Sequence, residues 1–211
     1  MSEQSAIAPA IARAVERLVN PQVYRPPNID VAARLEAGGY ARQVAGPDFD
    51  RVVEGFRRAF ETRNGGVLLI GPVGCGKTTA VRAMFSRPII LPVYDRVVMR
   101  SMLPEAEDGN DYKHAHESRT VVLDDIGSEP EISLWGVKVR AVAEWVMAWY
   151  DWHAVGGHPG RLCVTTNIGQ KSLDELAACN LYGDRVVSRL LSMCVVVRLT
   201  GSDHRRPLGM V

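Results

Sequence analysis

Residues 71–78 combine the residue types that bind a triphosphate. They fit the pattern G-x-x-x-x-G-K-[ST], in which glycines let backbone N–H groups curl around phosphate oxygens. Lys77 is expected to reach the β- and γ-phosphates, and the Thr78 hydroxyl is expected to ligate Mg²⁺. A glycine-rich turn matches by chance at times, but here an apolar run precedes the pattern and a helical stretch follows it. The predicted nucleotide contacts are Gly71, Pro72, Val73, Gly74, Cys75, Gly76, Lys77, Thr78 and Thr79.

Two consecutive carboxylates end the apolar run at residues 120–124. Asp124 is placed to hold Mg²⁺, and Asp125 is placed to orient the water that attacks the γ-phosphate. Aspartate is shorter than the glutamate common at that position by about 1.5 Å of reach, which leaves the rate of hydrolysis open. Glu129 is a second candidate acid. An Asp-rich turn without chemistry is the alternative, since turns favour aspartate for local reasons.

Asn167 follows another apolar run, residues 162–165. Because parallel strands all end at the ligand side of their sheet, Asn167 is expected between the two aspartates and the γ-phosphate. A side-chain amide there would hold the lytic water and sense the phosphate. The alternative is an N-cap for a helix at residues 172–178, a role that Ser172 can fill itself.

A helix predicted at residues 184–191 carries Arg185 and Arg189 on one stripe, four residues apart. Its apolar stripe consists of Val186, Val187, Leu190 and Leu191. Docking of the apolar stripe would turn both arginines outward, where they can reach the γ-phosphate of a neighbouring copy. An ordinary solvated helix face is the other interpretation, and this helix alone favours it.

Short apolar runs alternate with helical stretches from Gly66 onward, which is typical of a parallel sheet buried on both faces. The runs are residues 67–70, 89–93, 120–124, 162–165 and 194–199. Upstream, proline and glycine break residues 21–48 into a linker with one short helix near residues 30–37. Asp48 is predicted to cap the next helix, whose apolar face is Phe49, Val52, Val53, Phe56 and Phe60. We therefore divide the chain into an N-terminal helical extension and linker for partner binding, residues 1–47, and a nucleotide-binding core, residues 48–211.

The composition bounds the class of protein. A chain of 211 residues with 46% apolar and 23% charged residues is enough for one α/β domain and a short extension. Its net charge of +1 excludes a global basic coat, so any DNA contact must come from a local patch. None of the four cysteines (Cys75, Cys163, Cys179, Cys194) forms a C-x-x-C pair, which predicts reduced thiols in a cytoplasmic protein. No signal peptide and no membrane-spanning run is visible.

Two further features are assigned structural or solvent-exposed roles. Trp145, Trp149 and Trp152 repeat at helical spacing and are expected in core packing rather than in base stacking. Arg96 and Arg100 lie one helical turn apart and are interpreted as a solvated face rather than a DNA path.

Taken together, the motifs resemble the DnaC/IstB branch of AAA+ ATPases. The matching segments are GPVGCGKTT, VVLDDIGSEP, LCVTTNIG, YGDRVVSRL and VVVRLTGSDHR, within residues 66–205. The resemblance implies a three-layer sandwich of the P-loop AAA+ class with a five-stranded parallel sheet and no C-terminal helical lid. It implies that Asp125 is the catalytic acid, Asn167 the first sensor and Arg189 the trans-acting arginine finger, supported by Arg185. Asp203 stands where the family usually has serine.

The resemblance further implies an ATP- and Mg²⁺-dependent helicase loader that assembles through its ATP site, grips single-stranded DNA and holds a replicative helicase. An IstB-like transposition helper, which recruits a transposase on duplex DNA, is the alternative, and a nucleotide-dependent adaptor without catalysis is another. A small-molecule phosphotransferase is disfavoured because no acceptor pocket is visible. A GTPase is disfavoured because no N-K-x-D follows a strand.

Overall fold

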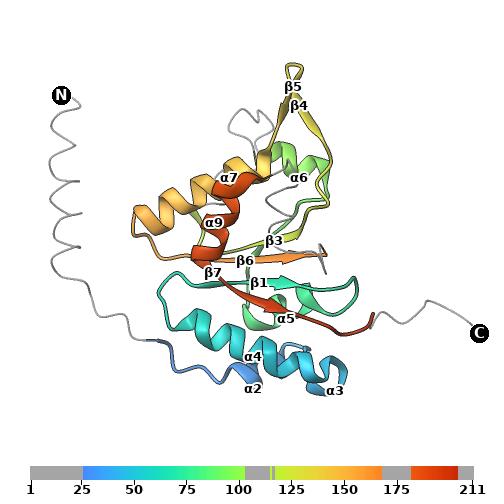
Figure 1. Ribbon diagram of the computed structural model, residues 1–211. Helices are drawn as coiled ribbons and strands as arrows, with labels where there is room; N and C mark the ends of the chain where they lie inside the picture. The colour runs from blue at the N-terminus through green and yellow to red at the C-terminus, as the bar shows by residue number, and fades with distance from the viewer. Residues whose placement is uncertain (1–25, 103–114, 116, 168–181, 204–211) are drawn as a thin grey trace, which may run out of the picture.

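The computed structural model describes residues 26–102, 115, 117–167 and 182–203 (Figure 1). Its centre is a parallel sheet of five strands in the order β2-β3-β6-β1-β7. The strands are β1 (Gly66–Ile70), β2 (Ile89–Pro92), β3 (Thr120–Ile126), β6 (Arg161–Thr166) and β7 (Cys194–Arg198). All five were predicted as apolar runs, and the predicted α/β class with a five-stranded parallel sheet is confirmed.

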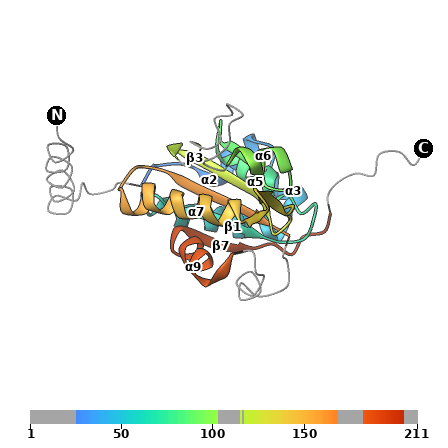
Figure 2. The ribbon, with the colours of Figure 1, turned by 90° about the horizontal axis from the view of Figure 1, so that it is seen from above.

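Helices cover both faces of the sheet, so the fold has three layers (Figures 1 and 2). The helices on one face are α2 (Val31–Ala37), α3 (Arg42–Ala45), α4 (Pro47–Phe60) and α5 (Lys77–Met84). Those on the other face are α6 (Arg96–Ser101), α7 (Ala141–Tyr150) with its π-helical extension η2 (Asp151–Val155), and α9 (Gly183–Met193).

Each strand sends alternate side chains into the two layers. Leu68 and Ile70 of β1 join the core under α6, α7 and α9, whereas Val67 and Leu69 join the core under α2, α4 and α5. Both sets are almost fully buried. Burial on both faces explains why these strands appear as continuous apolar runs in the sequence.

The predicted helix faces hold with three corrections. The apolar face of α4 is buried, as are Trp145 and Trp149 of α7, but Trp152 of η2, which was also expected in core packing, is 36% exposed. However, Leu191 is 41% exposed and lies outside the buried stripe of α9. The predicted N-cap role of Asp48 is wrong, because α4 begins at Pro47 and Gly46 occupies the cap.

Asp48 instead ties α4 to the segment after β7. Its carboxylate is 1% exposed and accepts hydrogen bonds from the backbone N–H groups of Thr200 at 2.8 Å and Gly201 at 2.6 Å. Arg51 donates to the same carboxylate at 2.7 Å. A buried carboxylate requires such donors, so Asp48 fixes the chain beside the phosphate loop.

Residues 26–47 pack onto the core across the proposed boundary at residue 47. Val31, Leu35, Tyr40 and Ala45 belong to the same buried cluster as Phe49 and Val81. Asp30 caps α2 by accepting from the N–H of Ala33, as the predicted short helix near residues 30–37 requires. Most of the N-terminal extension predicted at residues 1–47 (residues 1–25), the predicted helix at residues 172–178, and residues 204–211, which follow the last described strand, lie outside the described residues.

A two-stranded hairpin, β4 (Ile132–Leu134) and β5 (Val137–Val139), follows β3 and was not predicted. It projects beyond the sheet above α6 (Figure 1). Among the described helices, none is long and apolar enough to cross a membrane.

We expect Leu35→Ala to lower the free energy of unfolding of the core by about 2–5 kcal/mol, because it leaves a cavity between α2 and α5. Leu35 is 0% exposed. Urea denaturation checks this, with the exposed Glu36→Ala on the same helix as control. An unchanged midpoint in Leu35→Ala would show that α2 is not part of the cooperative core.

Candidate functional site

A bulge in β3 places two consecutive aspartates at one site. Leu123 pairs with Val164 and Ile126 pairs with Thr166, so Asp124 and Asp125 together lie opposite the single residue Thr165. Asp125 has a φ of 69°, which is rare for a residue other than glycine. In a regular strand, neighbouring side chains point to opposite faces. The bulge and the left-handed Asp125 bring both carboxylates to the same pocket.

Thr165 holds this bulge in place. Its hydroxyl donates to Asp124 Oδ1 at 2.8 Å and accepts from the backbone N–H of Asp125 at 2.9 Å. Thr165 was noted only as a strand residue, yet its position opposite two acids makes it part of the site. A hydroxyl residue opposite the acidic strand end is a signal that pairing of the two runs would have revealed.

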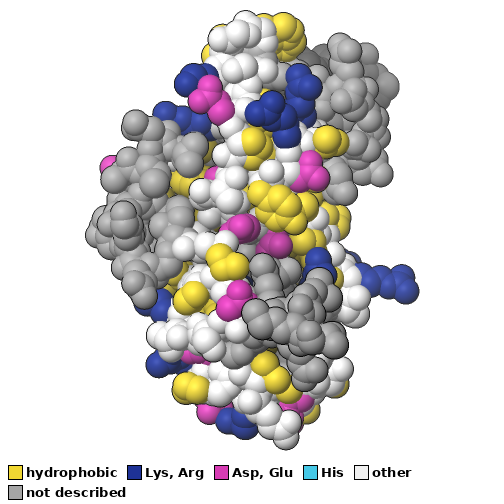
Figure 3. All heavy atoms as spheres, turned by 90° about the vertical axis from the view of Figure 1, so that its right-hand side faces the viewer, with side chains coloured by type: hydrophobic (Ala, Val, Ile, Leu, Met, Phe, Trp, Pro, Cys, Tyr) yellow, Lys and Arg dark blue, Asp and Glu magenta, His cyan; other side chains and the backbone are white. Residues whose placement is uncertain are grey.

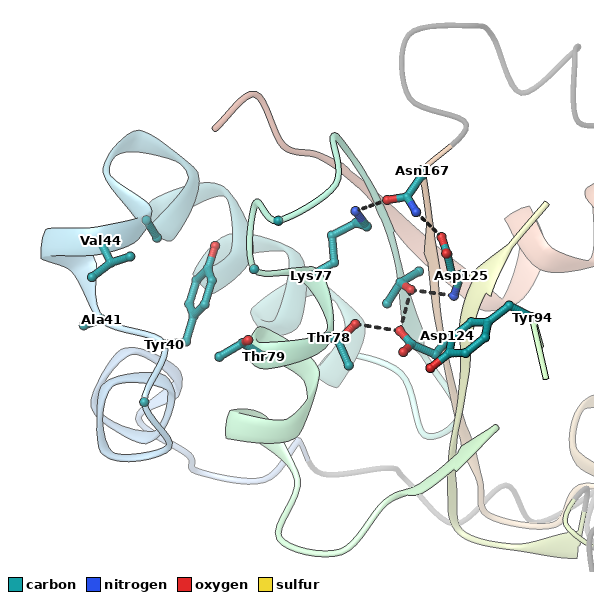
Figure 4. A pocket seen from close by; sticks show the side chains of 15 residues that line it. Tyr40, Ala41, Val44, Lys77, Thr78, Thr79, Tyr94, Asp124, Asp125 and Asn167 are labelled. Carbon is teal, nitrogen blue, oxygen red and sulfur yellow. Dashed lines mark hydrogen bonds between the residues drawn. The ribbon is translucent and has the colours of Figure 1, made fainter. Parts of the chain in front are cut away.

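A chain of hydrogen bonds joins Lys77 to Asp125 through Asn167 (Figure 4). Lys77 Nζ donates to Asn167 Oδ1 at 2.6 Å, and Asn167 Nδ2 donates to the Asp125 carboxylate. Lys77 is buried and also donates to the carbonyl oxygens of Gly71 at 2.9 Å and Pro72 at 2.7 Å. Its ammonium is thereby held at the mouth of the loop.

Asp124 faces the first turn of α5. Thr78 Oγ1 donates to Asp124 Oδ1 at 2.6 Å. A hydroxyl and a carboxylate at this separation form an all-oxygen donor pair, which is the ligand chemistry that Mg²⁺ prefers.

These groups line a pocket of about 420 Å³ whose two ends differ in chemistry (Figure 4). Lys77, Asp124, Asp125 and Asn167 gather at one end. The other end is lined by Gly39, Tyr40, Ala41, Val44 and Ala45. That wall comes from the segment interpreted as a linker, so sequence reasoning missed it.

Tyr40 is the main side chain of the apolar wall. Its ring stacks on Phe49 with centroids 5.9 Å apart. Burial raises the pKa of its hydroxyl far above the ordinary value, and Asp48 and Cys75 add to the rise. Among the described residues, this buried hydroxyl has no hydrogen-bond partner.

The predicted loop residues divide by role. Gly74, Gly76, Lys77, Thr78 and Thr79 line the pocket, Gly71 and Pro72 hold Lys77, Cys75 is buried, and Val73 is half exposed. Gly74 has a φ of 78°, and a Cβ there would come within 1.8 Å of Asp203 Oδ1. The positive φ favours glycine at this position, whereas the exposed Asp203 side chain could move away from an added Cβ.

Three cysteines in the described residues, Cys75, Cys163 and Cys194, are free and buried. Burial raises the pKa of Cys163 to about 12 and also raises the pKa of Cys75 and Cys194. They are thus protonated thiols at neutral pH, as expected of structural cysteines.

Glu129, the second candidate acid, is engaged elsewhere. It accepts hydrogen bonds from the N–H of Gly127 at 2.8 Å and from the Tyr182 hydroxyl, which also accepts from Gly127 at 3.0 Å. Burial raises the pKa of Glu129, while the bond from Tyr182 opposes the rise. Glu129 therefore joins the end of β3 to the start of α9.

The two arginines of α9 do not line the pocket. Arg185 is exposed, whereas Arg189 is half-buried against α7. The Arg189 guanidinium lies 4.5 Å from the centre of the Tyr150 ring and donates to Met147 Sδ. The structure thus brings Lys77, Thr78, Asp124, Asp125 and Asn167 together but leaves Arg185 and Arg189 on the opposite layer.

No family model matches the chain, and no curated protein matches its sequence. Three solved structures do match its backbone. The DnaC helicase loader is 20% identical with a TM-score of 0.50, over 85% of this chain and 96% of that one. The chain shares its fold with this structure. DnaI is 16% identical with a TM-score of 0.52, over 82% of this chain and 100% of that one. A candidate primosome component from Streptococcus pyogenes serotype M3 is 17% identical with a TM-score of 0.51, over 84% of each chain. The α/β fold with a five-stranded parallel sheet that the resemblance to the DnaC/IstB branch implies is therefore confirmed, whereas the absence of a C-terminal helical lid stays a prediction.

We expect Tyr182→Phe to destabilise the protein by about 1–2 kcal/mol at pH 7, because a buried carboxylate loses a donor. Burial raises the folded pKa of Glu129 above its unfolded value of about 4.5. The folded protein therefore binds the Glu129 proton more tightly than the unfolded chain does. As pH rises above about 4.5, Glu129 ionises, and the free-energy cost of burying its carboxylate grows. The loss in Tyr182→Phe should accordingly shrink as pH falls towards 4.5.

Urea denaturation at a series of pH values measures this loss. The exposed Tyr94→Phe serves as the control. A loss in Tyr182→Phe that is the same at every pH would contradict the assigned bond to Glu129.

Proposed function

We propose that the chain is an ATP-dependent helicase loader of the DnaC type. The observation that carries the proposal is the single pocket in which Lys77, Thr78, Asp124, Asp125 and Asn167 meet an apolar wall. The likeness in fold to the DnaC and DnaI loaders supports it. The groups that line the pocket support a nucleoside triphosphate as the ligand, and the shared fold supports helicase loading as the process.

The pocket suits a purine nucleoside triphosphate. The Lys77 ammonium and the backbone of Gly74 and Gly76 offer positive and N–H groups to phosphates at the start of α5. At the far end, Tyr40 and Val44 offer a flat apolar wall for a base, and the buried Tyr40 hydroxyl offers a polar atom without a partner among the described residues. ATP spans such a pocket because its two ends have matching polarity.

Mg²⁺ fits the same pocket by donor chemistry, because Thr78 and Asp124 present oxygen atoms side by side. These two residues would hold the ion, which would neutralise charge on the phosphate oxygens. Lys77 would then exchange its carbonyl partners for phosphate oxygens while keeping its place beside Asn167. In that state Asn167 reports the presence of the phosphate to Asp125.

Asp125 is the group that activates water in this proposal. Its carboxylate is oriented by the Asn167 amide, and its backbone is fixed by Thr165. A carboxylate so placed can accept a hydrogen bond from water and later its proton. Asn167 would orient the same water through its amide.

Assembly is proposed to complete the site. Arg189 would act on the nucleotide of a neighbouring subunit, with Arg185 in support, and its pose on Tyr150 would then belong to the unassembled subunit. A guanidinium supplied in trans neutralises charge as the γ-phosphate leaves, and such arginines are worth roughly 10³–10⁵ in rate. The partners are then a replicative helicase, single-stranded DNA and further copies of this chain. Residues 1–25 are proposed to contribute to helicase binding.

Lys77→Ala is expected to abolish measurable ATP binding, because it removes the ammonium that lines the pocket among the described residues. Titration with a fluorescent ATP analogue measures the affinity, and Asp125→Asn is the matched variant that should still bind but not hydrolyse. Tight binding by a folded Lys77→Ala protein would refute the site. Sustained turnover by Asp125→Asn would mean that another group activates the water.

Mixing variants tests the trans-acting arginine. Arg189→Ala and Asp125→Asn are each expected to be inactive, and their mixture should recover part of the ATPase rate, because one mixed interface pairs an intact Asp125 with an intact Arg189. Arg185→Ala is mixed in parallel. If activity recovers only in the mixture that contains Arg185→Ala, Arg185 is the trans-acting arginine. If neither mixture recovers activity although mixed oligomers form, neither arginine acts in trans.

The partner is tested by affinity capture from cells of the source organism, with the full chain and with ATP or no nucleotide. Recovery of a replicative helicase that depends on ATP and on Lys77 is the expected result. Recovery of a transposase instead would assign the chain to transposition.

A further inference from the structure

The tip of the β4–β5 hairpin holds a bulky side chain in an unfavourable backbone position. Leu134 pairs with Val137, so the turn consists of Trp135 and Gly136 alone. Both have positive φ, 48° for Trp135 and 80° for Gly136, which is the two-residue turn that favours Asn-Gly. Tryptophan at the first position is disfavoured by contact between its Cβ and the backbone.

Trp135 also contributes nothing visible to packing. Its side chain is 85% exposed, and Val137 beside it is 66% exposed. The base of the same hairpin is anchored, since Ile132 is buried in the core under α6 and α7. The backbone of Trp135 is strained and its ring is exposed, although the base of the hairpin is anchored. This combination indicates that Trp135 has a function other than stabilising the fold.

Basic side chains lie below the tip of the hairpin, along β5 and on α6. Lys138 and Arg140 lie on and after β5, and Arg96 and Arg100 lie on α6; all four are exposed. Met99 of α6 borders one pocket together with Lys138 and Arg140, so the helix and the hairpin are neighbours. Figure 3 faces the edge of the sheet where its strands end, and dark-blue side chains gather there below the tip of the hairpin.

Among the residues that the structure describes, most of this positive charge is not paired with an acid. Within the described residues, Arg96, Arg100 and Arg140 form no ion pair, and only Lys138 has one, with Glu131 at 2.9 Å. Of the nearby acids, Glu129 is bound to Tyr182 and Asp95 caps α6. An exposed aromatic ring among free arginines matches a strand of unpaired bases, whose rings stack and whose phosphates pair.

We propose that the hairpin tip is a contact for single-stranded nucleic acid, with one base stacked on Trp135 and adjacent phosphates on Arg140 and the arginines of α6. The inference rests on the proposed function and names the residues that would bind the single-stranded DNA. It reassigns Arg96 and Arg100 from a solvated face to a phosphate track. The hairpin lies on the nucleotide edge of the sheet, so this strand would pass close to the ATP site.

Trp135→Asn gives an unusually clean test, because asparagine is preferred in this turn. The variant should melt at or above the temperature of the native protein, yet bind a fluorescein-labelled oligothymidylate about 5- to 150-fold more weakly in the presence of ATP and Mg²⁺. Trp135→Phe, which keeps a ring, should retain most of the affinity. Fluorescence anisotropy of the full chain measures the dissociation constant.

Two controls separate stacking from general effects. Trp152→Ala removes a half-exposed tryptophan that stacks on His158, and it should bind the oligonucleotide normally. Arg140→Gln should reduce the slope of log affinity against log salt by about 0.7, the value for one phosphate on a single strand.

The outcomes distinguish this inference from the proposed function. If Trp135→Asn binds DNA with unchanged affinity, the inference is overturned and the proposed function is not. If Trp135→Asn loses helicase binding but keeps DNA binding, the inference is also overturned, and Trp135 is a protein contact. Failure to capture a helicase while Trp135→Asn still loses DNA would overturn only the loader role. A native protein that binds no single strand with ATP would overturn both the inference and the DNA part of the proposed function.

Discussion

Thr165 on β6 lies opposite two aspartates of β3 at once, and this two-to-one pairing governs the geometry of the whole site. Without the extra residue, Asp124 and Asp125 would point to opposite faces of the sheet, and only one would reach the pocket. With it, Asp124 faces Thr78 on α5 while Asp125 faces Asn167. The cost is a left-handed aspartate, which Thr165 stabilises by accepting the Asp125 N–H.

Sequence reasoning succeeded where the signal is local. The phosphate loop is one contiguous segment, and strands buried on both faces remain visible as apolar runs, so the sheet and the position of Lys77 followed directly. The bulge did not, because it exists only through pairing between β3 and β6. The wall formed by Tyr40 and Val44 was missed because proline and glycine suggested a linker, whereas Leu35 and Tyr40 find their apolar partners on α4 and α5. The β4–β5 hairpin was not predicted because each of its two strands has three residues.

The two layers of helices divide the work of the site. The layer with α5 supplies the phosphate loop and, through α2 and α3, the apolar wall. The layer with α9 carries the two arginines that we propose act on a neighbouring subunit, and it is linked to the acidic strand end by Tyr182 and Glu129. That link starts only two residues after Asp125, so it connects the proposed water-activating acid to the first turn of α9.

The strand order also constrains how the chain acquires its structure. β1 pairs with β6 and β7, which are the last two strands in the part of the chain that the structure describes, and Asp48 finds its donors at Thr200 and Gly201, later still. β1, with its apolar residues on both faces, therefore emerges from the ribosome long before either partner strand exists. Pairings so distant in sequence close slowly and leave edges exposed in the meantime. Folding of this core can therefore be completed only after β6 and β7 have left the ribosome, and β1 remains without its partner strands until then.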